Sequence, residues 1–223
     1  MDSLISIFKF FIELLAHPDK IISGVVANYG NWVYAFLFLI IFVETGLVIM
    51  PFLPGDSLLF LVGAFASQEI FNLWFSITLL FIAAVVGDTL NYLIGKKIGP
   101  VVFEKNYKFI KKEHLLKAQN FYEKHGAKAI ILARFVPIVR TFAPFIAGVA
   151  NMNYSKFISY NLIGGAIWVV GVTLLGFFLG EIPVIKNNFE KVVLLIVFVS
   201  ILPIIIEFFK SKFSKKVEVK KPV

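Results

Sequence analysis

The segment Phe157–Gly180 contains 24 consecutive residues without a charged side chain. About 20 apolar residues are enough for a helix to cross the hydrocarbon core of a bilayer. The rest of the chain agrees, since 59% of its 223 residues are hydrophobic and 16% are charged, whereas soluble domains are about 25% charged. We therefore predict an all-α polytopic membrane protein with one membrane domain at residues 29–209.

The remaining apolar stretches are shorter or are interrupted by charge and proline. They are Trp32–Met50 with Glu44, Ser57–Ala66, Leu73–Ile94 with Asp88, Ala129–Asn153 with Arg134 and Arg140, and Val192–Phe209 as the predicted last span. Near the N-terminus, Leu4–Ala16 is too short to cross cleanly and no small-residue cleavage site follows it. We expect residues 1–28 to form an amphipathic segment at the membrane interface.

The lysines predict the orientation of the chain. Residues 96–128 hold nine lysines against three glutamates and are expected to form an amphipathic surface loop, and the tail 210–223 holds six lysines against one acid. Because basic loops stay in the cytoplasm, both segments are predicted to be cytoplasmic. Ala129–Asn153 must then leave the cytoplasmic face and return to it within about 25 residues, which is too short for two crossings. A re-entrant hairpin, broken near Pro137 and Pro144, is the remaining solution.

The two halves of the membrane domain resemble each other. Gly63 and Gly148 are 85 residues apart, as are Gly95 and Gly180. In both halves, a broken and charged apolar segment precedes a full span, and the predicted orientations are opposite. We therefore predict an inverted-topology repeat, with repeat one at about 33–95 and repeat two at about 129–180. The first hairpin would turn at Pro51, Pro54 and Gly55.

Four charged residues lie in or beside these hairpins: Glu44, Asp56, Arg134 and Arg140. Each costs about 2.5–3.5 kcal/mol at the centre of an inserted helix, so such residues usually pair and mark function. Arginine suits phosphate binding, and a carboxylate among apolar atoms can take up a proton near neutral pH. We assign a phosphate head group to the arginines and proton coupling to the acids; the alternative is a structural ion pair. Asp88 is a further candidate, with a helix-end polar role equally compatible.

The sequence lacks the residues that the common enzyme mechanisms of membrane proteins need. The chain has no cysteine, its three histidines lie outside the predicted spans, and it has neither a GxSxG nor an HExxH motif. The pairs Gly55-Asp56 and Gly87-Asp88 loosely resemble intramembrane aspartyl proteases, but that activity would leave both arginines unexplained. We predict no enzyme, no metal and no cofactor. The net charge of +8 is attributed to the cytoplasmic face and anionic lipids, not to nucleic acid.

Four strings of residues carry a family resemblance: Phe42–Ser57, Gly87–Tyr92, Phe121–Gly126 and Ala133–Gly148. They resemble the DedA family of bacterial inner-membrane proteins, which is similar to the VTT-domain proteins, and the likeness covers roughly Tyr29 to Glu207. The resemblance implies two re-entrant hairpins, movement of lipids such as undecaprenyl phosphate or glycerophospholipids across the bilayer, and dependence on the proton motive force. Two acids and two arginines that the family requires match Glu44, Asp56, Arg134 and Arg140.

Taken together, we expect a flippase- or scramblase-like transporter of a phosphate-bearing lipid, with undecaprenyl phosphate as the first candidate, in the bacterial inner membrane. The partners would be membrane lipids and protons or Na⁺, and the glycine-rich helix at 164–176 predicts a homodimer. Two alternatives stay open. One is a proton- or sodium-coupled transporter of a small solute, and the other is a scaffold for envelope assembly.

Overall fold

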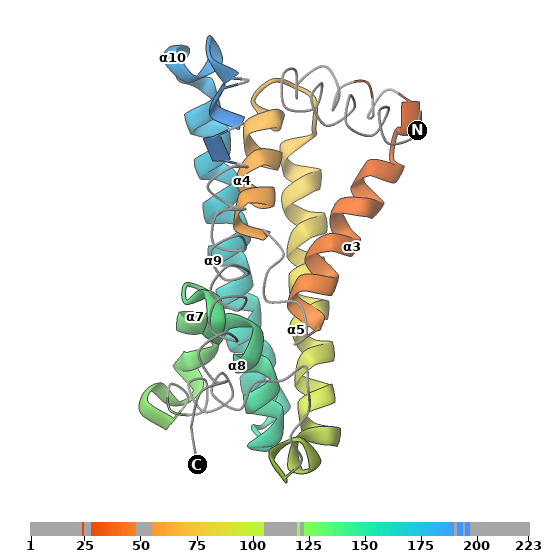
Figure 1. Cartoon of the computed structure of the whole chain (residues 1–223), viewed down its shortest axis with the longest axis vertical. Coiled ribbons are helices and arrows are strands. Elements are labelled where there is room, and N and C mark those ends of the chain that lie inside the picture. The colour runs from red at the N-terminus through yellow and green to blue at the C-terminus, as the bar shows by residue number, and fades with distance from the viewer. Residues whose placement is uncertain are drawn as a thin grey trace, which may run out of the picture.

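The computed structural model describes residues 24, 28–47, 55–104, 120, 123–189, 191–193 and 195–196. All secondary structure within these ranges is helical (Figure 1). The elements are α3 (Trp32–Gly46), α4 (Gly55–Ala66), α5 (Leu73–Glu104), the short 3-10 helix η1 (Gly126–Lys128), α7 (Ala129–Ala133), α8 (Pro137–Val149), α9 (Tyr154–Glu181) and α10 (Pro183–Lys186). The predicted all-helical fold is confirmed for this part of the chain.

Among the described residues, two helices are long and apolar enough to cross a membrane. They are the segment Leu73–Lys97 of α5, with 25 residues, and α9, with 28 residues. At about 1.5 Å per residue, each exceeds the roughly 30 Å of the hydrocarbon core. The other apolar helices, α3, α4 and α8, have 15, 12 and 13 residues and are too short for a full crossing. Figure 1 shows these short helices beside the long ones.

Helix α4 lies against α9 through a pair of glycines. A Cβ atom on Gly63 would overlap the carbonyl oxygen of Thr173, and a Cβ atom on Gly176 would overlap the carbonyl oxygen of Phe60. Each helix therefore offers a glycine to the backbone of the other. Without side chains at these two points, the helix axes approach closely.

Helix α8 lies against α5 in the same way. A Cβ atom on Gly148 would overlap the carbonyl oxygen of Tyr92, and one on Gly95 would overlap the carbonyl oxygen of Phe145. Gly148 thus plays in α8 the part that Gly63 plays in α4, as the sequence spacing predicts. The matching of Gly95 with Gly180 is wrong, however, because Gly176 is the residue with the equivalent contact. Corresponding residues of the two long helices, such as Gly95 and Gly176, are therefore four positions closer in the sequence than corresponding residues of the two short helices, such as Gly63 and Gly148.

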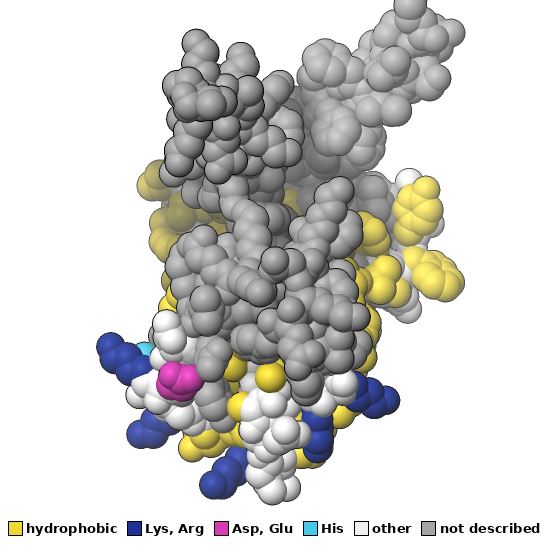
Figure 2. All heavy atoms as spheres, turned by 60° about the horizontal axis from the view of Figure 1, so that its bottom comes forward, with side chains coloured by type: hydrophobic (Ala, Val, Ile, Leu, Met, Phe, Trp, Pro, Cys, Tyr) yellow, Lys and Arg dark blue, Asp and Glu magenta, His cyan; other side chains and the backbone are white. Residues whose placement is uncertain are grey.

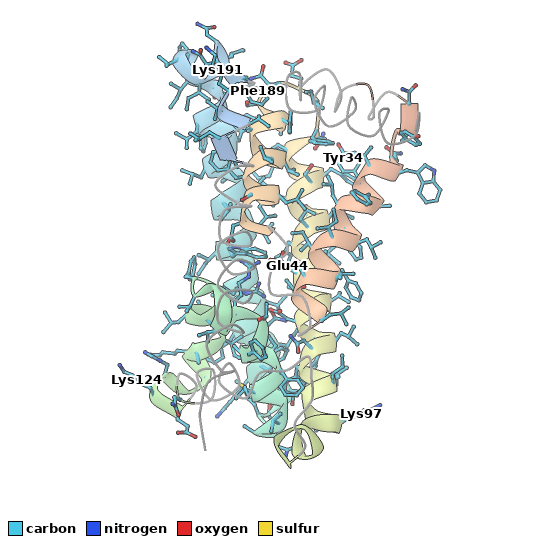
Figure 3. The ribbon with its side chains drawn as sticks, viewed as in Figure 1. Tyr34, Glu44, Lys97, Lys124, Phe189 and Lys191 are labelled. Carbon is cyan, nitrogen blue, oxygen red and sulfur yellow. The ribbon has the colours of Figure 1, made fainter. Side chains whose placement is uncertain are left out.

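The apolar core of the described part of the chain has two parts. The first lies among α3, α4, α5 and α9 and includes Ile41, Leu59, Phe65, Leu80 and Val169. The second lies among α5, α7, α8 and α9 and includes Tyr92, Ile130, Phe142, Phe145 and Phe157. Glu44 lies near mid-height between Phe189 toward one end of the molecule and Lys97 toward the other (Figure 3). A charged side chain thus lies midway between the two ends.

One end of the molecule is rich in lysine, as Figure 2 shows. Among the described residues, the exposed lysines near this end are Lys96, Lys97, Lys124, Lys128 and Lys156. Positively charged residues gather on the cytoplasmic side of membrane proteins, so this end is the one that we expect to face the cytoplasm. At the opposite end, Trp32 and Trp74 are exposed, as is typical of aromatic residues at a membrane interface.

Several sequence predictions concern residues outside the described part: residues 1–23, Pro51 and Pro54, most of the loop 96–128, most of Val192–Phe209, and the tail 210–223 with its cytoplasmic orientation. One prediction about a break is wrong. Helix α8 continues through Pro144, because a proline can be accommodated inside a membrane helix where neighbouring helices support the freed backbone groups. The chain turns instead at residues 134–136, and Pro137 occupies the first turn of α8, where its missing N–H is not needed.

Candidate ion-pair site

Helix α3 ends where it meets α5, and this contact places the first acid. A Cβ atom on Gly46 would lie 3.4 Å from the Cα atom of Gly87, so the two backbones touch. Glu44 precedes the contact in α3 and Asp88 follows it in α5, which brings both side chains to one pocket. Gly55, the first residue of α4, lies so close to the Glu44 carboxylate that a Cβ atom there would overlap it. Gly55 therefore shapes the site as well as marking the start of a helix.

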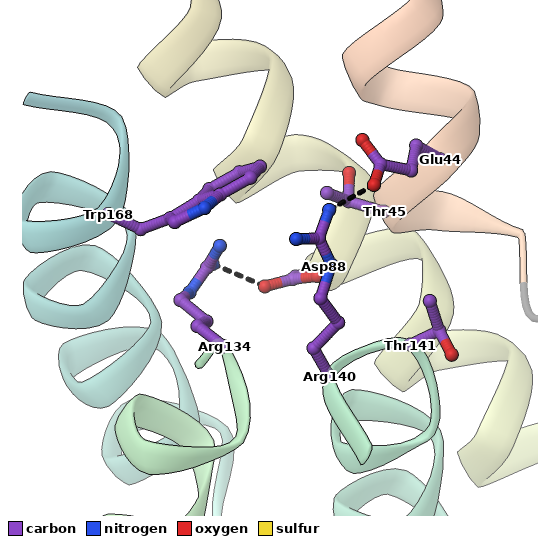
Figure 4. Close-up of a pocket in the computed structure, with 7 residues that line it drawn as sticks. All are labelled: Glu44, Thr45, Asp88, Arg134, Arg140, Thr141 and Trp168. Carbon is purple, nitrogen blue, oxygen red and sulfur yellow. Dashed lines mark hydrogen bonds and ion pairs between the residues drawn. The ribbon is translucent and has the colours of Figure 1, made fainter. Parts of the chain in front are cut away.

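The turn between α7 and α8 places both arginines. Arg134 follows the last residue of α7, and its backbone N–H donates to the carbonyl of Ile131. Arg140 lies one turn into α8, and its backbone N–H donates to the carbonyl of Val136. Both side chains reach the same pocket from neighbouring points of one short segment (Figure 4).

Arg134 is enclosed by the two long helices. It forms an ion pair with Asp88 of α5, and its Nη2 atom donates to Oδ1 of Asn161 in α9 at 2.5 Å. The amide of Asn161 in turn donates to the carbonyl of Val85 at 3.1 Å. Only 6% of each of the Arg134 and Asp88 side chains is exposed. This guanidinium therefore ties α5, α7 and α9 together.

Arg140 connects the two halves of the chain. It forms an ion pair with Glu44 of α3, and its Nη1 atom donates to Oδ1 of Asp56 in α4 at 2.9 Å. The three side chains differ in exposure: 3% for Glu44, 11% for Arg140 and 59% for Asp56. One guanidinium thus joins α8 to both short helices of the first half.

The ring of Trp168 lies against both arginines. Its ring centroid is 4.7 Å from Cζ of Arg140 and 5.6 Å from Cζ of Arg134, within the range of cation–π attraction. Its indole N–H donates to Oδ1 of Asp56 at 2.6 Å. Trp168 is 2% exposed and stands near the middle of α9. Trp168 therefore supplies a buried hydrogen-bond donor at the level of the ion pairs.

Asn91 connects the backbones beside the ion pair of Glu44 and Arg140. Its amide donates to the carbonyl of Thr45 at 3.1 Å and to the carbonyl of Thr141 at 2.8 Å. These two residues directly follow Glu44 and Arg140 in the sequence. Asn91 has no exposed surface, so its amide fixes the relative position of α3 and α8 from within α5.

The pocket at the centre is small and polar. It is lined by Glu44, Thr45, Asp88, Arg134, Arg140, Thr141 and Trp168. The volume open to the centre of a water molecule among them is about 10 Å³, which is room for about one water molecule. A phosphate group is larger than one water molecule, so it fits only if a side chain of the site moves.

The structure brings together all four of the charged residues that the sequence analysis assigned to the hairpins. It resolves the pairing that the sequence left open, since Arg140 meets Glu44 and Asp56, whereas Arg134 meets Asp88. Within the described ranges, no group of three or more His, Cys, Asp and Glu side chains has the arrangement of a metal site.

Trp168 and Asn161 are among the site residues that the sequence analysis missed. Both lie inside the uncharged segment Phe157–Gly180, which drew attention only as a membrane span. Tryptophan is enriched at membrane interfaces, so one at the middle of a span is a signal that points to a polar partner. A buried asparagine in a span carries the same signal, because its amide needs hydrogen bonds there.

The fold and the site define a class: a helical membrane protein with a network of ion pairs enclosed between two long helices. Comparison with known proteins identifies the family. Residues 53–178 match the family model of the VTT domain. The chain belongs to this family, which includes DedA, and is a DedA-family membrane protein.

Several relatives are close. The chain is 51% identical to Protein DedA of Escherichia coli (strain K12) over 206 residues, which covers 91% of this chain and 94% of that protein. It is 46% identical to an uncharacterized membrane protein of Mycobacterium leprae over 168 residues, covering 75% of each. It is 35% identical to the inner membrane protein YqjA of Escherichia coli (strain K12) over 173 residues, covering 77% of this chain and 74% of YqjA. No solved structure matches the chain.

Proposed function

We propose that this chain moves a phosphate-bearing lipid between the leaflets of the bacterial inner membrane and couples this movement to proton binding. Undecaprenyl phosphate is the first lipid to test, and a glycerophospholipid is the second. The membrane assignment draws support from the relative YqjA, which is named an inner membrane protein. In this proposal the protein transports the lipid without altering it chemically, so it is not an enzyme.

The charge balance of the site carries the proposal. Arg134 and Arg140 face Glu44, Asp56 and Asp88. With all five groups ionised, the site holds three negative and two positive charges. Glu44 and Asp88 are enclosed, whereas Asp56 is 59% exposed. Binding of one proton or one Na⁺ would bring the whole site to neutrality, as is favoured for charged groups inside a membrane protein. This imbalance supports a coupling ion, with the proton as our choice.

The arginines supply the recognition of the head group. A guanidinium offers paired N–H donors that match phosphate oxygens. Because the pocket has room for about one water molecule, a phosphate must displace a carboxylate from an arginine. Protonation of Glu44 or Asp56 weakens its hold on Arg140 and frees donors for the lipid. Proton binding and head-group binding are thereby linked at one guanidinium.

The packing supports an inverted repeat of two re-entrant hairpins as the framework for this movement. Helix α4 lies on α9 through Gly63 and Gly176, and α8 lies on α5 through Gly148 and Gly95. Each short helix therefore packs on the long helix of the other half. Transporters built on inverted repeats alternate between two access states by moving one repeat against the other around a central site.

The glycines of α9 support a homodimer less strongly than the sequence suggested. Among the glycines that suggested it, Gly164 and Gly165 lie against Arg134, and Gly176 lies against Phe60. These residues serve packing within one chain. In this group, Gly171 alone has open space where a Cβ atom would lie, and we propose no dimer from it.

The deciding experiment is transport by the full chain in proteoliposomes. Labelled undecaprenyl phosphate and a labelled glycerophospholipid would be followed with an impermeant quencher, under a pH gradient, a Na⁺ gradient or neither. We expect movement of one lipid above the rate of empty liposomes, acceleration by the pH gradient, and recovery of unaltered lipid. Glu44→Gln should abolish the gradient effect, whereas Glu181→Gln, which changes an exposed acid at the end of α9, should not.

Failure of the folded wild-type protein to move either lipid under any gradient would contradict the proposal. A solute flux driven by the same gradients would then favour the small-solute alternative. Acceleration by Na⁺ alone would retain lipid transport and replace the coupling ion.

A further inference from the structure

Asp56 is held at the site in the way that an anionic ligand would be held. A single oxygen atom, Oδ1, accepts hydrogen bonds from Nη1 of Arg140 at 2.9 Å and from Nε1 of Trp168 at 2.6 Å. The remainder of this side chain is open, with 59% of its surface exposed. The two other acids of the site are enclosed, since Glu44 is 3% and Asp88 is 6% exposed. Asp56 is thus the carboxylate that can leave with the least rearrangement.

The donors that hold Asp56 are suited to a phosphate oxygen as well. Carboxylate and phosphate oxygens both accept charge-assisted hydrogen bonds from arginine, with similar lengths. The indole N–H of tryptophan is a donor only, so it needs an acceptor in either state. An oxygen atom of a phosphate placed at the position of Asp56 Oδ1 would accept both hydrogen bonds without movement of Arg140 or Trp168.

We propose that Asp56 is an internal substitute for the head-group phosphate, and that Trp168 is a third head-group ligand beside Arg134 and Arg140. The phosphate displaces Asp56 when the lipid binds, and Asp56 returns when the lipid leaves. This inference rests on the proposed function and assigns to that site a residue and an exchange step. The ligand chemistry is that of a phosphate monoester or diester.

The ring of Trp168 is held in place during the proposed exchange of Asp56 and phosphate. It faces the guanidinium groups of both Arg140 and Arg134, and this attraction does not depend on the acceptor of the indole N–H. The ring therefore stays in place while its N–H changes partner. Replacement of the tryptophan by phenylalanine would keep an aromatic face toward the arginines and remove the donor.

The first test measures lipid binding to the full chain in nanodiscs. The probes are undecaprenyl phosphate, undecaprenol, which lacks the phosphate, and inorganic phosphate. We expect Trp168→Phe to weaken binding of undecaprenyl phosphate about tenfold or more, the effect of one hydrogen bond to a charged acceptor. The matched control is Trp74→Phe, since Trp74 is 68% exposed and lies outside the site. Its affinity should equal that of the wild type.

The second test separates a substitute from an ordinary ligand-binding residue. If Asp56 competes with the phosphate, Asp56→Asn should bind undecaprenyl phosphate more tightly than the wild type and release it more slowly. Weaker binding by a folded Asp56→Asn protein would overturn the proposal. Equal binding by Trp168→Phe and the wild type would also overturn it, while lipid transport by the wild type would leave the proposed function intact.

Fluorescence reports the exchange directly. The chain has three tryptophans, so Trp32→Phe combined with Trp74→Phe leaves Trp168 as the sole tryptophan, whose emission is then excited selectively. Addition of undecaprenyl phosphate should shift its emission, and undecaprenol should not. A full shift with inorganic phosphate at the same concentration would assign the site to free phosphate and overturn the lipid assignment. Absence of any shift with a lipid that the protein demonstrably transports would overturn the role of Trp168.

Discussion

Arg134 and Arg140 are six positions apart in one short segment, yet their surroundings differ. Arg134 is enclosed by Asp88 and Asn161, which belong to the two long helices. Arg140 is held by Glu44 and Asp56 from the two short helices of the first half, and one of these partners is largely exposed. We infer from this difference that Arg134 holds the fold together, whereas Arg140 is the arginine that changes partners in the proposed transport.

The largest expected effect is on the stability of Arg134→Ala. This change leaves Asp88 buried without its ion-pair partner, which destabilises a protein by about 3–5 kcal/mol. We expect a marked loss of folded protein, measured by thermal unfolding in detergent and by size-exclusion chromatography. The double variant Arg134→Met with Asp88→Asn should regain much of that stability, because no buried charge remains unpaired. A stable, monodisperse Arg134→Ala protein would contradict the anchoring role.

Arg140→Ala should stop transport even in the protein that folds. Glu44, which is 3% exposed, loses its ion pair, whereas Asp56 is 59% exposed and can be solvated without the arginine, so we expect a loss of stability no larger than for Arg134→Ala. Transport should nevertheless fall to the rate of empty liposomes, because the guanidinium whose N–H groups would donate to the phosphate is missing. The check is lipid transport per folded molecule, with Lys156→Ala as a control for the loss of a positive charge. Retained transport would place the exchange at Arg134 instead and reverse the comparison.

The smallest effect is expected from Asn91→Leu. The change removes two hydrogen bonds, to the carbonyls of Thr45 and Thr141, each of which is worth about 0.6–1.7 kcal/mol in a membrane protein. Because these bonds fix the backbones beside Glu44 and Arg140, we expect the stability to fall and the pH optimum of transport to shift. The matched control is Thr173→Val, which alters a fully buried hydroxyl that has no hydrogen-bond partner among the described residues. An unchanged pH profile in Asn91→Leu would leave Asn91 a purely structural residue.

Much of the class and part of the site followed from sequence because the signals are local. An uncharged run such as Phe157–Gly180 predicts a membrane-spanning helix by its length and composition alone. Charges such as Glu44 and Arg140 stand out because burying them is costly. Proline and glycine marked where short helices begin, and Pro137 and Gly55 do stand at the starts of α8 and α4. The spacing of Gly63 and Gly148 also identified corresponding contacts.

Other features depended on how the helices meet. Pro144 looked like a break, but packing keeps α8 continuous through it. The counterpart of Gly95 is Gly176 and not Gly180, because the contact depends on the rotation of each helix as well as on its place in the sequence. For Asp88, a site role and a helix-end polar role were equally compatible with the sequence, and its ion pair with Arg134 places it in the site.

By itself, the sequence determined that this protein is helical and suited to a membrane, that its short helices are broken from its long ones, and that acids and arginines lie where apolar residues would be expected. These properties are set by composition and by the energy of each residue in its own segment. Only the tertiary structure decided which acid meets which arginine, and that Trp168 and Asn91 join them. Such pairings depend on distances between residues far apart in the chain, and the close glycine contacts between helices fix those distances.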